Sequence, residues 1–63
     1  MTKEPCFRSV NKVTGKKIVF FDRTTAVMTT ITEAKRSGNV HWLYDLVGKR
    51  VHRVFNERGE PHD

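Results

Sequence analysis

The sequence predicts a small α+β domain in which one helix packs on an antiparallel sheet, with its elements in the order ββαββ. Three features lead to this fold class: a glycine turn between two early apolar segments, a central segment that ends in Gly38, and a late apolar segment that Gly48 interrupts. Because 63 residues can build only one hydrophobic core, we expect a single domain over residues 1–63, with frayed ends at about 1–5 and 57–63. An all-β meander or small barrel is the alternative architecture.

The first two strands are expected to form a hairpin around Gly15. Residues 7–13 alternate between two sets of side chains, which are Phe7, Ser9 and Asn11 on one side and Arg8, Val10 and Lys12 on the other. That period of two is typical of a strand, and the short apolar run 17–22 fits a second strand. Gly15 stands where a type I turn followed by a bulge requires a left-handed backbone. The expected hairpin tip carries three lysines, namely Lys12, Lys16 and Lys17.

Residues 25–37 are predicted to form the helix. Three apolar residues fall on one helical face, namely Val27, Ile31 and Ala34. Thr30 and Glu33 have the spacing of a capping box, in which a hydroxyl and a carboxylate bond the free amides of a helix start. Gly38 follows where helices commonly end. The threonines of this segment would also suit a strand, because β-branched side chains lose rotamer freedom in a helix, but the helical signals together favour the helix.

Residues 40–55 are predicted to form two strands separated by Gly48 and Lys49. A strand puts four apolar residues on one face, namely Val40, Trp42, Tyr44 and Leu46. A single helix would leave Trp42 and Leu46 opposite the main apolar stripe, and Gly48 would weaken it by about 1 kcal/mol relative to alanine. That helical alternative would create a helix-turn-helix. The aromatic residues expected in the core are Phe20, Trp42 and Phe55.

No combination of residues in the sequence predicts catalysis or a cofactor. Cys6 is the single cysteine, so no internal disulfide can form, and we expect it to pack as a small apolar residue. His41, His52 and His62 have spacings that match no zinc pattern, and the first two are expected on polar faces. The carboxylates form no close pair for acid–base chemistry. We therefore expect a protein that is not an enzyme, with no catalytic residue, no metal and no cofactor.

The distribution of charge favours a negatively charged partner. The formal net charge is +5, and residues 1–31 carry six basic residues against two acidic ones, whereas residues 32–63 carry six against five. Basic groups neutralise phosphates, and exposed aromatic faces can stack on unpaired bases. The candidate nucleic-acid-binding residues are Lys12, Lys16, Lys17, Arg23, Lys49, Arg50 and Arg53. The candidates for stacking, or for an interface, are Phe21, Trp42 and Tyr44.

The sequence leaves a second class of function open. Aromatic residues with arginine are common anchors of protein interfaces, so a small regulator or inhibitor of the viral or mobile-element type, which binds another protein, is the alternative. A homodimer through the same surface is equally compatible with the sequence. The apolar run Ile18–Phe21 is too short to cross a bilayer, and the N-terminus lacks the apolar core of a signal peptide. We expect a cytoplasmic protein with no membrane partner.

Overall fold

The computed structural model describes residues 4–62 and contains one helix and one antiparallel sheet. Its elements are β1 (Phe7–Asn11), β2 (Lys17–Phe20), α1 (Arg23–Ser37), β3 (His41–Asp45), β4 (Arg50–Phe55) and β5 (Pro61–His62). The strand order is β2-β1-β3-β4-β5. The predicted ββαββ fold is confirmed. The all-β alternative is wrong because α1 is helical, and the helix-turn-helix alternative is wrong because β3 and β4 are strands.

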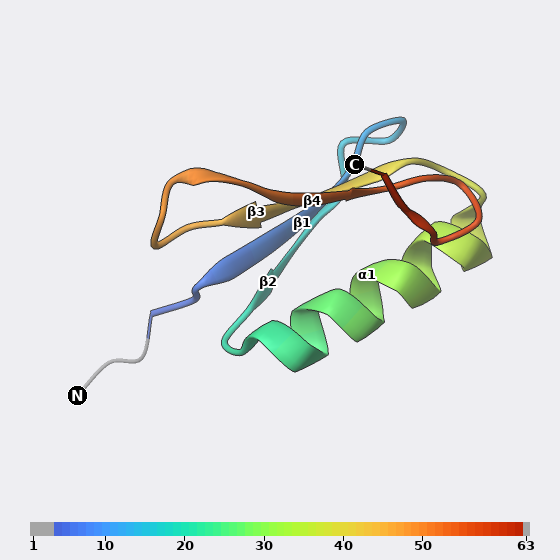
Figure 1. The fold of residues 1–63 in the computed structure, drawn as a ribbon. Coiled ribbons are helices and arrows are strands. Elements are labelled where there is room, and N and C mark those ends of the chain that lie inside the picture. The colour runs from blue at the N-terminus through green and yellow to red at the C-terminus, as the bar shows by residue number, and fades with distance from the viewer. Residues whose placement is uncertain (1–3, 63) are drawn as a thin grey trace.

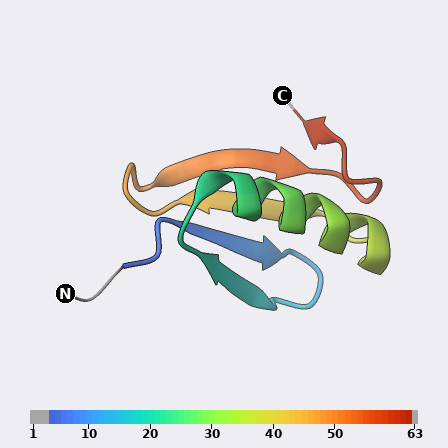
Figure 2. The ribbon, with the colours of Figure 1, turned by 90° about the horizontal axis from the view of Figure 1, so that it is seen from below.

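The helix covers only one face of the sheet. Figure 1 shows the sheet nearly edge-on with α1 beneath it, and Figure 2 shows α1 lying across the strands. On the other face, no helix or strand of the described residues covers the sheet. Since successive side chains of a strand point to opposite faces, each strand supplies one set of residues to the core under α1 and another to the uncovered face.

The core lies between α1 and the sheet. Its buried residues are Phe7, Phe20, Ala26, Ala34, Leu43 and Phe55, and Cys6, Ile18, Val27 and Ile31 pack against them. Burying one large apolar side chain is worth about 1.5–3 kcal/mol, so the four large members provide most of the stabilisation. The expectation that Phe20 and Phe55 lie in the core is confirmed. Trp42 was expected with them, but it belongs to the opposite face and is half-buried, because it is one residue out of phase with buried Leu43.

The helix begins earlier than the capping box predicted. Asp22 is its N-cap, and the Asp22 carboxylate accepts a hydrogen bond from the Thr25 backbone N–H at 2.9 Å. Thr30 lies in the helix interior and is fully buried, and its hydroxyl donates to the Ala26 carbonyl at 2.6 Å. The capping box at Thr30 is therefore wrong, because Asp22 supplies the cap eight residues earlier. Gly38 ends the helix with φ of 70°, as predicted.

The C-terminal segment is ordered over most of the stretch that was expected to fray. The Asn56 side chain accepts hydrogen bonds from the N–H groups of Arg58 and Glu60, and Gly59 has φ of 76°. This turn brings β5 back to pair with β4. Gly59 is buried against α1, where an added Cβ would lie 2.9 Å from the Ile31 carbonyl oxygen. The stretch 57–62, which was predicted to fray, thus contains a hydrogen-bonded turn and a paired strand, and residues 1–3 and 63 lie outside the described residues.

Candidate nucleic-acid interface

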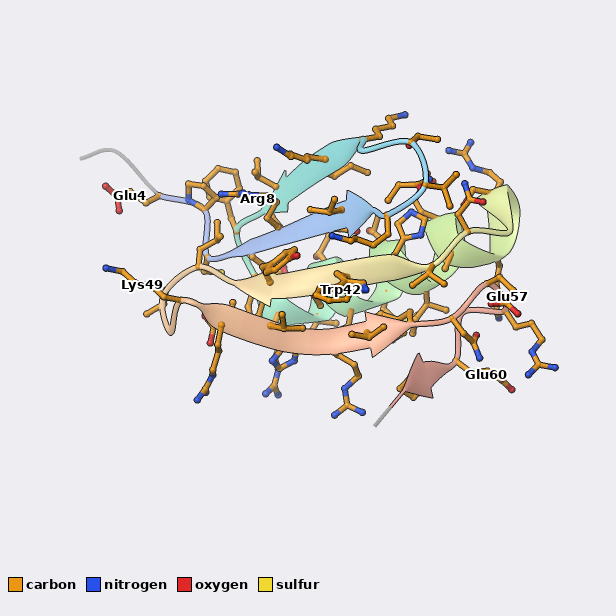
Figure 3. All side chains as sticks on the ribbon, turned by 90° about the horizontal axis from the view of Figure 1, so that it is seen from above. Glu4, Arg8, Trp42, Lys49, Glu57 and Glu60 are labelled. Carbon is orange, nitrogen blue, oxygen red and sulfur yellow. The ribbon has the colours of Figure 1, made fainter. Side chains whose placement is uncertain are left out.

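The uncovered side of the sheet is a continuous surface that we call the open face. Antiparallel register pairs Val10 with Trp42, Arg8 with Tyr44 and Tyr44 with Val51, and paired residues share a face. The open face is formed by Arg8, Val10, Lys17, Val19, Trp42, Tyr44, Val51 and Val54. Figure 3 looks onto it: Trp42 lies over β3 near its centre, Arg8 and Lys49 lie toward one end, and Glu57 and Glu60 lie at the other.

Trp42 and Tyr44 form an aromatic pair at the centre of the open face. They stand two residues apart on β3, their ring centroids are 6.1 Å apart, and their planes are tilted by 42°. Both side chains are half-buried, so part of each ring remains accessible from the uncovered side. Val51 stands beside Tyr44 on the neighbouring strand β4 and is 40% exposed, and Val19 lies two strands from β3, on β2, and is 49% exposed. A rigid sheet thus presents two aromatic rings within a shallow apolar surface.

Basic side chains lie near this aromatic pair on the open face. The Lys12 ammonium lies 4.5 Å from the Trp42 ring centroid, which is a cation–π contact. Lys17 pairs with Val10 and so stands on the open face, as does Arg8. Among the described strand residues the one carboxylate is Asp45, whose side chain is engaged in the adjoining turn. The open face therefore carries cations beside its aromatic rings and no carboxylate of its own.

The β3–β4 turn closes one end of the open face and forms a pocket of about 300 Å³. Its walls include Arg8, Tyr44, Leu46, Lys49, Arg50 and Val51. The Gly48 N–H, with that of Val47, donates to the Asp45 carboxylate, and these bonds together with the charge of Arg50 hold the pKa of Asp45 below its ordinary value. Asp45 is thus ionised at neutral pH, while Arg8, Lys49 and Arg50 bring three cations to the same pocket.

The structure divides the three lysines of the first hairpin between the two sides of the sheet. Lys12 and Lys17 belong to the open-face side, as described above. Lys16 lies on the helix side, where its charge helps to lower the pKa of Glu33 in α1, although the hydrogen bond from Arg36 is the largest cause of that shift. The three lysines therefore do not share one side of the sheet, because consecutive residues of an extended segment face opposite ways.

The remaining predicted binding residues do not all lie on the open face. Arg23 and Arg53 line a second groove on the helix side, between α1 and β4. Phe21 is 48% exposed in the connection between β2 and α1, two strands away from β3, so it does not join the aromatic pair. Arg8 was not among the predicted site residues, although the alternation of residues 7–13 already put it on the same side as Val10 and Lys12. Lys49 and Arg50 lie together at the pocket.

His41, His52 and Cys6 make packing contacts within the described structure. His41 is buried rather than on a polar face, and its Nδ1–H donates to the Asn39 carbonyl at 3.0 Å. The His52 ring packs edge-on against Phe7 with centroids 5.3 Å apart. Cys6 is partly buried against the core. Within residues 4–62, no three His, Cys, Asp or Glu side chains come together as metal ligands. The one described helix is too short and too polar to span a membrane.

Comparison with known proteins gives no relative to set beside this geometry. No family model matches the chain, and neither a curated protein nor a solved structure is significantly similar to it.

Proposed function

We propose that this protein is a non-enzymatic binding protein that holds single-stranded nucleic acid on the open face of its sheet. The observation that carries the proposal is the Trp42–Tyr44 pair, which stands on the uncovered face instead of in the core. A protein of this size gains stability by burying its large aromatic side chains. Two neighbouring rings that remain half-exposed therefore favour a binding role.

The chemistry of the open face suits unpaired nucleotides. A base stacked on an aromatic side chain contributes about 1–3 kcal/mol, and every base offers a ring for such stacking. Trp42 and Tyr44 can each take one base, while Lys12, Lys17 and Arg8 are near enough to contact the flanking phosphates. Lys12 is released from the indole ring when a base stacks there, and its flexible side chain then reaches a phosphate.

The same chemistry disfavours a double helix as the ligand. The bases of a duplex are stacked on one another, so they cannot stack on Trp42 or Tyr44 without being extruded. We therefore expect a preference for single strands over duplexes of the same length.

The matched pair Lys16 and Lys17 tests the proposal. They are neighbours in sequence and both are exposed, but only Lys17 faces the open side. Binding of a labelled single strand is followed by fluorescence anisotropy across a range of salt concentrations. Lys17→Gln is expected to weaken binding and to reduce the slope of log K against log salt by about one, whereas Lys16→Gln leaves both unchanged. Equal effects of the two substitutions would contradict binding through the open face.

One observation favours the alternative that the open face binds another protein. Val51, beside the aromatic pair, and Val19, farther out on β2, add exposed apolar surface to the open face, and an aromatic centre with arginine at its edge is typical of protein interfaces. A regulator or inhibitor of that kind, or a homodimer through the same face, would bind with little dependence on salt, whereas phosphate contacts weaken steeply as salt rises. The salt titration therefore separates the two functions.

A further inference from the structure

We propose that the pocket at the β3–β4 turn binds one nucleotide of the strand, next to those on Trp42 and Tyr44, and that Lys49 and Arg8 hold its phosphate. This inference rests on the proposed function and adds a third position to it. The pocket lies where the open face ends, and Tyr44 belongs both to the aromatic pair and to the pocket wall. A strand that runs along β3 therefore continues into it.

The walls of the pocket suit a nucleotide better than a simple anion. Tyr44, Leu46 and Val51 supply an apolar surface on which a base can rest, and the cations stand beside it. The volume of about 300 Å³ is at the lower end of the range typical of small-molecule sites. A base with its phosphate matches both the mixed chemistry and the modest size.

The backbone of the turn supplies a second, independent observation. Lys49 has φ of 55° and is the one described residue other than glycine with a positive φ. That conformation is strained for a residue that bears a side chain, and such strain is concentrated at functional sites. A glycine would adopt it freely. We take the presence of lysine at this position as support for a role of its charge in the pocket.

The charges around the pocket leave two cations available for a phosphate. Asp45 lies 3.8 Å from the Arg50 guanidinium and also accepts the two turn amides, so it is engaged within the turn. Neither Lys49 nor Arg8 forms an ion pair with a carboxylate among residues 4–62. Arg8 reaches the pocket from β1 and Lys49 from the β3–β4 turn, which lets them contact one phosphate from two sides.

Backbone-amide chemical shifts test the assignment, with thymidine 5′-monophosphate and hexathymidylate as the probes. The monophosphate is expected to shift the amides of residues 46–51, and thymidine, which has no phosphate, is expected to leave them in place. Lys49→Asn keeps a residue that tolerates the left-handed backbone but removes the charge, and it should reduce hexathymidylate affinity about fivefold. Arg58→Gln is the control, because Arg58 is an exposed cation in the turn at the opposite end of the sheet.

The outcomes separate this inference from the proposed function. If hexathymidylate shifts the β3 amides around Trp42 and Tyr44 but leaves residues 46–51 unchanged, the pocket does not hold a nucleotide, while the open face still binds the strand. Equal losses of affinity in Lys49→Asn and Arg58→Gln would also overturn the inference, because the effect would then be one of net charge. If hexathymidylate does not bind at all, both proposals are wrong.

Discussion

The two hairpins that flank the open face have the same turn geometry but place different residues in it. Asn11 in the first turn and Asp45 in the second each accept hydrogen bonds from the N–H groups two and three residues later, at 2.9–3.1 Å. The fourth residue after each of them has a positive φ, which is 80° at Gly15 and 55° at Lys49. The first turn places glycine at the strained position, and the second places lysine there.

On the proposed function, we interpret this difference as that between a turn that serves stability and a turn that serves binding. At Gly15 the backbone requirement is met without strain, and an added Cβ would have open space around it. At Lys49 the same requirement is met with strain, beside a pocket lined with basic and aromatic groups. The residue whose side chain accepts the turn hydrogen bonds also differs. It is the neutral Asn11 in the first turn and the ionised Asp45, which lies beside Arg50, in the second. Three substitutions test this comparison.

The largest expected effect is that of Gly15→Val, because a β-branched residue would be forced into the left-handed region. The substitution should lower the free energy of unfolding by about 1–2 kcal/mol. Since nothing lies within 4 Å of the new Cβ, the loss would arise from the backbone alone. Chemical denaturation followed by circular dichroism measures it, and an unchanged midpoint would mean that Gly15 does not hold this conformation in solution.

The second expected effect is a gain in stability. Lys49→Gly removes the strain at the corresponding position, so it should raise the free energy of unfolding by about 0.5–1 kcal/mol, after allowing for the greater freedom of glycine in the unfolded chain. The same variant should bind hexathymidylate more weakly. Denaturation and anisotropy on one preparation check both parts. A variant that is less stable than the original protein would show that the two turns are not equivalent.

The smallest expected effect concerns Asp45→Asn, which makes the second turn chemically like the first. Asparagine keeps the acceptor oxygen that Asn11 uses, so the turn should persist, while loss of one negative charge near the pocket should tighten strand binding about two- to threefold. A decrease in affinity would mean that Asp45 positions Arg50 for binding and does not merely compete with the phosphate.

The same substitution should alter the response of stability to acid. The pKa of Asp45 is lowered in the folded protein, so ionised Asp45 stabilises the fold above its ordinary pKa of 3.8, and this contribution is lost as pH falls through the lower folded-state value. The Asp45→Asn variant should therefore lose less stability on acidification than the original protein. Glu33, whose pKa is also lowered, leaves part of the acid dependence in both proteins.

Much of the fold could be predicted from the sequence because local signals agreed with the tertiary structure. The glycine turn at Gly15, the helix end at Gly38 and the break at Gly48 each marked a boundary that the structure has. The predicted helix starts two residues late, at Thr25, because the capping pattern at Thr30 and Glu33 was the one considered and the cap is Asp22. The fifth strand was missed because two residues carry no pattern, although Asn56 and Gly59 had the chemistry of a turn.

The site was harder to predict because it depends on which face of each strand the helix covers. Alternation placed Trp42 and Tyr44 together on one face, but the sequence alone could not tell whether α1 packs on that face or on the other. Leu43 and His41 turned out to face the helix, so Trp42 lies on the open face. The pairing of Arg8 with Tyr44 could not be predicted either, because it depends on the register between strands that are more than 30 residues apart in the sequence.

The central claim is that a single strand stacks on Trp42, and the fluorescence of this residue tests it most directly because Trp42 is the one tryptophan in the chain. In the free protein, we expect a soluble quencher to reach the half-exposed indole. Addition of hexathymidylate should change the emission with saturation and should protect the indole from the quencher, and added salt should reverse both effects. A labelled strand that binds while the emission and the quenching of Trp42 remain unchanged would contradict the account.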